Sequence, residues 1–478
     1  MATTTITFRG RDLALIPPPE LATQALPELL PTLFGAHLPG ELRAELALDP
    51  RGHFLRAKPI HFSALKQALQ AQGTLFSVSF DERPALPFAT RLTIQPRPYQ
   101  EEALANWRDA HHAGVVVLPT GAGKTLVAAL ALHELSLWTL AIVPTLDLLA
   151  QWRSALASAL DLDPASIGVF GGGAKELQPI TIMTYDSAAL YPRELRRFGL
   201  LIFDECHHLP APTYRQIAEC ASTPLRVGLS ATPERADLAH ADLTFLVGPE
   251  VYRRSPSELT GDRYLAQYHE QRINIALTPE DEARYNEQRQ IYRDYLRSRR
   301  VIIRTPEDFQ RQVVYTSAYD PAARAALLAW REARNISMNA PAKYAEIERL
   351  LRLHATDQMI LFSEYNAVVD EVSRRFCLPS ITYKTPTEER RAILERFRAG
   401  QYTKLVSGRV LNEGVDVPDC RVAIIVSGNS TRREYIQRLG RVLRPKDGEA
   451  LLYELISSGT TEEHISQRRR SSHHPTPK

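Results

Sequence analysis

Cysteine is scarce in this sequence. The 478 residues include four cysteines, and none of them forms a CxxC pair with another; they are Cys206, Cys220, Cys377 and Cys420. The spacing argues against a zinc ribbon and against a thiolate-bound iron–sulfur cluster, because both use closely paired cysteines. Isolated thiols are also typical of a reducing compartment, where they stay free.

Strong net charge and long apolar runs are absent as well. The formal charge is only +3, so any basic binding surface must be local. No apolar run approaches the ~20 residues that cross a bilayer. The N-terminus has no apolar core behind a basic start, as a signal peptide would have. These absences predict a cytoplasmic protein without a membrane partner.

Short, continuous apolar runs are present in two stretches of the chain. They are Val115–Leu118, Leu140–Val143, Ile180–Met183, Leu200–Phe203 and Arg226–Leu229, and later Met359–Phe362, Lys404–Val406 and Ala423–Val426. Strands that are apolar on both faces are typical of a parallel sheet covered by helices on each side. The length suggests roughly three domains. The fold class is therefore α/β, with two parallel-sheet domains in tandem.

The remaining segments differ from these two stretches in composition and in the spacing of their apolar residues. Proline and glycine punctuate a small α+β domain at 1–88, with a helix from Phe62 to Ala71 and a strand from Thr74 to Phe80. We expect the first α/β domain at 89–278, a helical insertion at 279–340, the second α/β domain at 341–466 and a disordered tail at 467–478. Tyrosines alternate with arginines in the insertion; by itself this pattern favours a solvated helix with tyrosines packed inward.

A glycine-containing turn joins the first apolar run to a helix. It consists of Pro119, Thr120, Gly121, Ala122, Gly123, Lys124 and Thr125. Backbone N–H groups at a helix N-terminus stabilise an anion. Lys124 adds a charge for the β- and γ-phosphates of ATP, and the Thr125 hydroxyl suits Mg²⁺. Leu118 replaces the first glycine of GxxxxGK[ST], yet the strand–turn–helix context favours a phosphate-binding loop over a chance GKT.

Two acids follow the apolar run Leu200–Phe203 directly. Metal-assisted phosphoryl transfer needs such a pair, with Asp204 holding Mg²⁺ through water and Glu205 polarising the attacking water. An isolated pair of acids is usually no more than a polar strand end. Its position about 80 residues after a phosphate-binding loop favours ATP hydrolysis.

A third pattern lies in the second α/β domain. In Gln437-Arg438-Leu439-Gly440-Arg441-Val442-Leu443-Arg444 the arginines recur at i, i+3 and i+6, so they share one helix face. Such a run of arginines usually forms an exposed basic stripe on a helix. Its position in a second α/β domain instead favours arginines that reach ATP held by the first domain. Domain closure would then be coupled to hydrolysis.

Together these motifs resemble superfamily 2 helicases and translocases. The resemblance rests on Arg97-Pro98-Tyr99-Gln100, LPTGAGKT, DECHH, Ser230-Ala231-Thr232 and QRLGRVLR. More narrowly, GLSATPERADLAHADLTFLVGPEVY, NEGVDVPDCRVAIIVSGNSTRREYIQRLGRVLRPK and LYELISSGTTEEHISQRRR resemble the XPB family of nucleotide-excision-repair helicases. The resemblance covers roughly residues 90 to 470. It implies two RecA-like domains, a thumb-like insertion and an N-terminal damage-recognition domain.

The resemblance also implies roles for individual residues. Arg97 and Gln100 would contact the adenine side of ATP, and Gly414 and Asp416 would lie at the nucleotide face between the domains. The expected catalytic set is Lys124, Glu205, Gln437, Arg441 and Arg444. His207, Ser230 and Thr232 would couple hydrolysis to domain motion. Thr145, Thr184, Arg235 and Ser363 would contact DNA, and Arg and Tyr side chains of the insertion would grip a strand.

The chain departs from the family pattern at one motif. The family's Arg-Glu-Asp element, associated with strand separation, aligns with Arg235-Ala236-Asp237. The middle carboxylate is missing, which leaves translocation plausible and puts strong unwinding in doubt.

The sequence therefore predicts an ATP- and Mg²⁺-dependent DNA helicase or translocase of XPB type, nucleoid-associated when bound to DNA. It offers no nuclease constellation, so strand cutting would need a partner nuclease. The motor motifs leave open an RNA helicase, the motor subunit of a restriction system, or an ATP-driven clamp that unwinds weakly.

Overall fold

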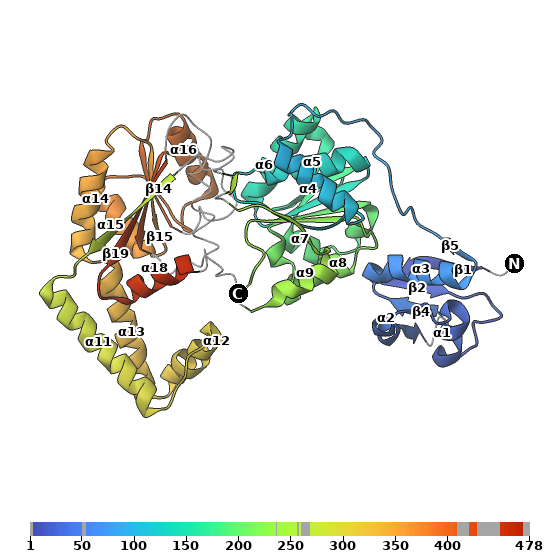
Figure 1. Ribbon diagram of the computed structural model, residues 1–478, viewed down its shortest axis with the longest axis horizontal. Coiled ribbons are helices and arrows are strands. Elements are labelled where there is room, and N and C mark those ends of the chain that lie inside the picture. The colour runs from blue at the N-terminus through green and yellow to red at the C-terminus, as the bar shows by residue number, and fades with distance from the viewer. Residues whose placement is uncertain are drawn as a thin grey trace. The chain divides into compact units, whose positions relative to one another are not determined.

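Three β-sheets organise the chain (Figure 1). The computed structural model describes residues 3–49, 54–235, 237–255, 258–259, 268–408, 420–427 and 450–471. The chain divides into two units, Met1–Gly261 and Asp262–Lys478. The first unit contains the N-terminal domain and one parallel-sheet domain, and the second contains the other parallel-sheet domain with a helical insertion.

The N-terminal domain is a small α+β domain, as the sequence predicts. Its sheet has the order β3-β4-β2-β1-β5, with β1 and β5 parallel and the other pairs antiparallel. Its strands are β1 (Thr4–Arg9), β2 (Asp12–Ile16), β3 (Ala47–Asp49), β4 (Phe54–Ala57) and β5 (Phe76–Val78), and its helices are α1 (Leu26–Phe34), α2 (Gly40–Glu45) and α3 (Phe62–Gln72). Helix α3 matches the predicted helix, whereas β5 is shorter than the predicted strand.

The first parallel-sheet domain follows. Its strand order is β13-β6-β12-β11-β7-β10-β8-β9, and every pair is parallel except β8 with β9. The strands are β6 (Ala113–Val117), β7 (Thr139–Val143), β8 (Ile167–Gly171), β9 (Ala174–Lys175), β10 (Ile180–Thr184), β11 (Leu200–Asp204), β12 (Arg226–Ser230) and β13 (Glu250–Arg253). All five predicted apolar runs are strands of this sheet.

Helices cover both faces of this sheet. Helices α4 (Pro98–Asp109), α5 (Lys124–Leu135) and α6 (Leu146–Leu160) lie on one face; α7 (Tyr185–Leu190), α8 (Pro212–Glu219) and α9 (Leu243–Leu246) lie on the other (Figure 1). The central strands β7, β10 and β11 are buried along their whole length. The loops that follow the carboxyl ends of these strands carry the expected functional residues.

The second sheet is parallel throughout, with the order β14-β19-β18-β15-β17-β16. Its strands are β14 (Tyr268–Ile275), β15 (Met359–Ser363), β16 (Ser380–Ile381), β17 (Lys404–Ser407), β18 (Val422–Ser427) and β19 (Ala450–Ser457), and its helices are α14 (Pro341–Leu353), α15 (Asn366–Phe376), α16 (Thr387–Arg398) and α18 (Thr461–Ser471). Helices α14 and α15 pack on one face and α16 on the other.

Two expected boundaries need correction. Strand β14 pairs with β19 of the second sheet, whereas the sequence predicts that the first α/β domain extends to residue 278. A strand's own residues do not specify a partner that lies so far along the chain. Helix α18 continues to Ser471, so the segment predicted to be disordered from 467 is helical over its first residues. Residues 472–478 lie outside the described part of the chain.

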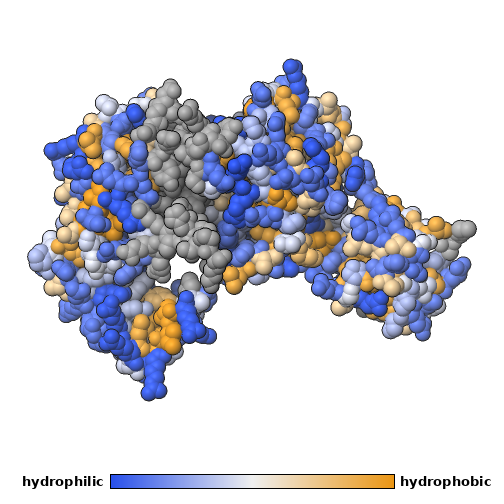
Figure 2. All heavy atoms as spheres, viewed as in Figure 1, coloured by the Kyte–Doolittle hydropathy of each residue, from blue (hydrophilic) through white to orange (hydrophobic). Residues whose placement is uncertain are grey.

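The helical insertion packs its tyrosines inward. Helices α11 (Pro279–Ser298) and α13 (Pro321–Met338) lie side by side, and α12 (Pro306–Phe309) lies between them in the chain. Tyr285, Tyr292 and Tyr295 are buried, so the stacking role that the resemblance implied for tyrosines of this helix is not supported. Two other tyrosines of the insertion, Tyr315 and Tyr319, are 67% and 78% exposed. Figure 2 also shows hydrophobic residues on the surface of the insertion.

Helix α11 is the longest helix in the described ranges, and it is rich in charged residues. Among the residues that the structure covers, no helix is both long and apolar enough to cross a membrane.

Candidate nucleotide site

The predicted phosphate-binding loop lies between β6 and α5. Gly121 and Gly123 have φ of 84° and 77°, a left-handed backbone that favours glycine. A Cβ on Gly123 would lie 2.6 Å from Nε2 of Gln100, so a side chain there would also collide. Helix α5 begins at Lys124, and its first turn directs backbone N–H groups into the loop. The loop therefore has the geometry of an anion site.

Side chains of helix α4 form hydrogen bonds to the backbone of this loop. Tyr99 Oη donates a hydrogen bond to the carbonyl oxygen of Ala122 at 2.7 Å, and Gln100 Nε2 donates to the same oxygen at 3.0 Å. Gln100 Oε1 accepts from the backbone N–H of Arg97 at 2.9 Å. The Gln100 side chain is 2% exposed, so in this structure it braces the loop. Tyr99 belongs to the Arg97-Pro98-Tyr99-Gln100 motif, and its contact with the loop is not evident from the sequence.

The two predicted acids stand at the carboxyl end of β11, beside the loop. Lys124 Nζ lies 4.0 Å from Glu205 Oε1. Asp204 accepts hydrogen bonds at both carboxylate oxygens, from Trp152 Nε1 at 2.9 Å and from the backbone N–H of Glu205 at 3.1 Å. Glu205 has a φ of 47°, which is unusual for a residue with a side chain and typical of a functional position. Residues about 80 positions apart in sequence thus share one site.

Burial and the neighbouring charges set the ionisation of the two acids. Burial, and next the charge of Glu205, raise the pKa of Asp204 above its usual range. Burial alone would also raise the pKa of Glu205, but the charge of Lys124 and the hydrogen bond to His207 lower it overall. Glu205 is therefore the carboxylate of the pair that stays ionised.

The predicted coupling residues surround Glu205. His207 Nδ1 lies 3.3 Å from Glu205 Oε2 and 3.2 Å from Ser230 Oγ. Ser230 Oγ also accepts the backbone N–H of Thr232 at 3.2 Å. Because β11 and β12 are adjacent in the sheet, these contacts join the ends of the two strands.

Several buried polar atoms of the site lack a hydrogen-bond partner within the described residues. They are Thr120 Oγ1, Thr232 Oγ1 and Nε2 of His207. Such orphans are rare in folded proteins and call for an explanation, such as a missing ligand. A polyphosphate at the loop offers acceptors for the hydroxyl groups. The hydroxyl of Thr125 and the carboxylate of Asp204 are hard oxygen donors of the kind that Mg²⁺ prefers, so the residues fit that ion.

Two of the predicted DNA-contact residues begin helices at the same sheet edge. The Thr145 hydroxyl accepts the backbone N–H of Leu148 at 3.3 Å and caps α6, and the Thr184 hydroxyl caps α7 through Ser187 at 3.3 Å. These helix N-termini follow β7 and β10, whose carboxyl ends lie side by side. Phosphate oxygens are favoured at such N-termini.

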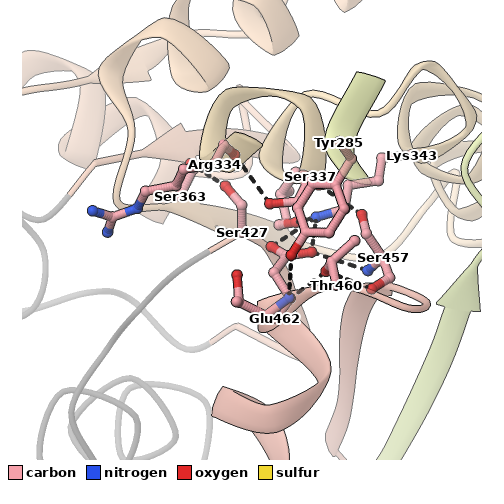
Figure 3. Close-up of polar contacts among 11 residues, drawn as sticks. Tyr285, Arg334, Ser337, Lys343, Ser363, Ser427, Ser457, Thr460 and Glu462 are labelled. Atoms are coloured by element: carbon pink, nitrogen blue, oxygen red, sulfur yellow. Dashed lines mark hydrogen bonds and ion pairs between the residues drawn. The ribbon is translucent and has the colours of Figure 1, made fainter. Parts of the chain in front are cut away.

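The other two predicted DNA contacts are engaged within the protein. Arg235 forms a two-point ion pair with Asp237, at 2.9 and 2.6 Å, and donates to the carbonyl oxygen of His207 at 2.8 Å. Ser363 Oγ is buried and lies 2.8 Å from Ser427 Oγ (Figure 3). In this conformation neither side chain is directed at an external strand.

The remaining predicted site residues lie outside the described part of the chain. They are Gly414, Asp416, Gln437, Arg441 and Arg444. The same holds for Ala236, the residue that departs from the family's Arg-Glu-Asp element.

A parallel sheet with a phosphate-binding loop, followed in the chain by a second parallel sheet, defines a helicase-like α/β ATPase. The Hef helicase domain of Pyrococcus furiosus has this fold: it superposes with a TM-score of 0.57 at 19% identity, over 79% of this chain and 99% of that one. The family models for the res subunit of type III restriction enzymes and for the ERCC3/RAD25/XPB C-terminal helicase match residues 93–235 and 325–472.

Two relatives identify the family within this class. The DNA 3'-5' translocase XPB2 of Sulfurisphaera tokodaii is 43% identical over 81% of this chain and 87% of its own length. The DNA 3'-5' helicase XPB of Kineococcus radiotolerans is 32% identical over 78% of this chain, which spans 62% of that relative. The chain belongs to the XPB family of helicases.

Proposed function

We propose that the chain is an ATP-dependent DNA helicase or translocase of XPB type that acts in DNA repair. The observation that carries this proposal is the meeting of Lys124 with Glu205 at 4.0 Å beside the phosphate-binding loop, in a chain of the XPB family. Relatives named 3'-5' translocases and helicases favour movement in the 3'-5' direction.

In this proposal, the loop residues 119–125 bind the phosphates of ATP, with Lys124 on the β- and γ-phosphates. Glu205, which its lowered pKa keeps ionised, would polarise the attacking water and act as the catalytic base. Thr125 and Asp204 would hold Mg²⁺, which supplies charge neutralisation on the phosphates. His207, Ser230 and Thr232 would pass the change at Glu205 to the neighbouring strand end. As the family resemblance implies, Gln437, Arg441 and Arg444 would act on the γ-phosphate.

DNA would lie along the sheet edge where Thr145 and Thr184 cap their helices, with the 1–88 domain recognising damage. Phosphate contacts dominate such binding, so affinity should fall steeply with added salt. Because the sequence holds no nuclease constellation, we also propose a partner nuclease. The protein would work in the cytoplasm, on the nucleoid.

The direct test is ATPase activity with and without DNA. Lys124→Ala and Glu205→Gln should each lower the DNA-stimulated rate by at least 100-fold, as roughly expected when charge stabilisation or the general base is removed. Arg108→Ala, which breaks an exposed ion pair with Glu134 remote from the loop, is the matched control and should retain the wild-type rate. Full activity in either site variant contradicts the mechanism.

A translocase or clamp with weak unwinding is the second candidate, because Ala236 replaces the carboxylate that the family associates with strand separation. ATP hydrolysis without displacement of a forked duplex supports this candidate, whereas efficient displacement supports a helicase. Stimulation by RNA rather than DNA would indicate an RNA helicase, and co-purification with a methylase would indicate a restriction motor.

A further inference from the structure

Trp152 lies against the acid pair without belonging to any of the motifs. It lies on α6, its side chain is 2% exposed, and its indole N–H donates to Asp204 Oδ2 at 2.9 Å. Asp204 Oδ1 accepts the backbone N–H of Glu205 at 3.1 Å. Both carboxylate oxygens are therefore held, one by each donor, which fixes the plane of the carboxyl group.

The main chain at Asp204 is also held. Tyr185 Oη, from the first residue of α7, donates to the carbonyl oxygen of Asp204 at 3.0 Å. Tyr185 is buried as well. Helices from both faces of the sheet thus converge on one aspartate: α6 fixes its side chain and α7 its backbone.

A second buried tryptophan shows that the fold does not require this arrangement. Trp107 is 1% exposed, and its indole N–H donates to the backbone carbonyl of Arg226 at 2.8 Å. A buried indole N–H needs an acceptor, and a main-chain carbonyl meets that need. Trp152 differs because its acceptor is the carboxylate that the proposed function assigns to the metal ion.

We propose that Trp152 is a positioning residue that orients the Asp204 carboxylate for the Mg²⁺ ion bound with the nucleotide; the proposal rests on the proposed function. A carboxylate that can rotate spends part of its time in orientations that do not face the ion. Outer partners of metal ligands fix this orientation, and their loss typically weakens metal affinity about 10- to 100-fold.

The test compares ADP binding in Mg²⁺ and in EDTA, measured by calorimetry on the full chain. In Trp152→Phe the aromatic ring stays and the N–H is lost. We expect the ratio of the two ADP affinities to fall by about tenfold or more, while the affinity in EDTA stays at the wild-type value. Trp107→Phe, the matched control, loses a similar buried hydrogen bond away from the loop and should keep the wild-type ratio.

The outcomes separate this proposal from the proposed function. An unchanged ratio in Trp152→Phe, or an equal fall in Trp107→Phe, overturns the role of Trp152 and leaves the ATPase assignment intact. A wild-type chain that binds no ADP in either condition contradicts the proposed function itself.

A second measurement keeps Trp152 and does not depend on the folding of its variant. In a chain with Trp107, Trp138 and Trp330 changed to phenylalanine, the emission of Trp152 should change with Mg²⁺ and ADP and should not change with ADP in EDTA. The same emission in both conditions contradicts the proposal.

Discussion

Each of the two α/β domains places a lysine beside a carboxylate, and the surroundings of the two lysines differ. In the first domain, Lys124 Nζ lies 4.0 Å from Glu205 Oε1, and its hydrogen bond to the Leu118 carbonyl oxygen is 3.4 Å long. In the second, Lys343 Nζ donates to both oxygens of Glu462 at 3.0 and 2.8 Å and to the Val426 carbonyl at 3.0 Å. All three of its protons are used.

The carboxylate that pairs with the second lysine is hydrogen-bonded further (Figure 3). Glu462 Oε2 also accepts the backbone N–H of Ser457 at 2.9 Å, and Ser457 Oγ donates to the Ser337 carbonyl at 2.6 Å. Tyr285 Oη accepts the backbone N–H of Thr461 at 2.9 Å. This network joins the insertion helices α11 and α13 and the C-terminal helix α18 to the second sheet.

The difference indicates that Lys343 stabilises the fold, whereas Lys124 belongs to the proposed nucleotide site. A buried charge is tolerated when every donor and acceptor around it is paired, and the Lys343 network meets this condition. The Lys124 site leaves polar atoms of Thr120, His207 and Thr232 without a partner among the described residues. Buried polar atoms without a partner, beside a lysine with a long hydrogen bond, are expected at a nucleotide-binding site.

The largest expected effect follows from breaking the completed network. Lys343→Met leaves the Glu462 carboxylate buried and uncompensated, since the two side chains are only 1% and 5% exposed. We expect a loss of about 3–5 kcal/mol in the free energy of unfolding, measured by urea denaturation of the second unit. Lys343→Met with Glu462→Gln should recover most of the loss; a loss as large in the double variant would mean that the charge is not the cause.

The equivalent change in the first domain should have an effect that depends on pH. Burial raises the pKa of Asp204, so in the folded chain its ionised form is disfavoured. Stability then declines as pH rises from the usual aspartate range through the raised pKa. Asp204→Asn removes this pH-dependent penalty, but its amide offers only one of the two acceptors that Trp152 and Glu205 use. The stability of the variant relative to wild type should therefore rise by about 1 kcal/mol from acid to alkaline pH, while ATPase activity is lost. Thermal unfolding at several pH values checks this; a constant difference between the two chains across the pH range contradicts it.

The Lys124 site can be predicted from the sequence, whereas the Lys343 network cannot. The loop from Pro119 to Thr125 and the acids Asp204 and Glu205 can be recognised because glycine turns and strand ends are local features. Lys343 and Glu462 are 119 residues apart and their pairing depends on how α14 and α18 pack. The same reason explains why the sequence does not reveal the contact of Trp152 with Asp204, and why the predicted domain boundary at 278 leaves β14 in the first α/β domain.

The smallest expected effect compares two hydroxyl groups. Ser457 Oγ is fully buried and donates to the Ser337 carbonyl at 2.6 Å, so Ser457→Ala should lower the free energy of unfolding by about 1 kcal/mol. The buried Thr232 hydroxyl has no partner among the described residues. Thr232→Val, which keeps the shape, should therefore leave stability unchanged or slightly raise it, while it lowers DNA-stimulated ATPase activity. Equal stability losses in both variants would mean that the Thr232 hydroxyl serves the fold, and the contrast between an open site and a completed network would then rest on Thr120 and His207 alone.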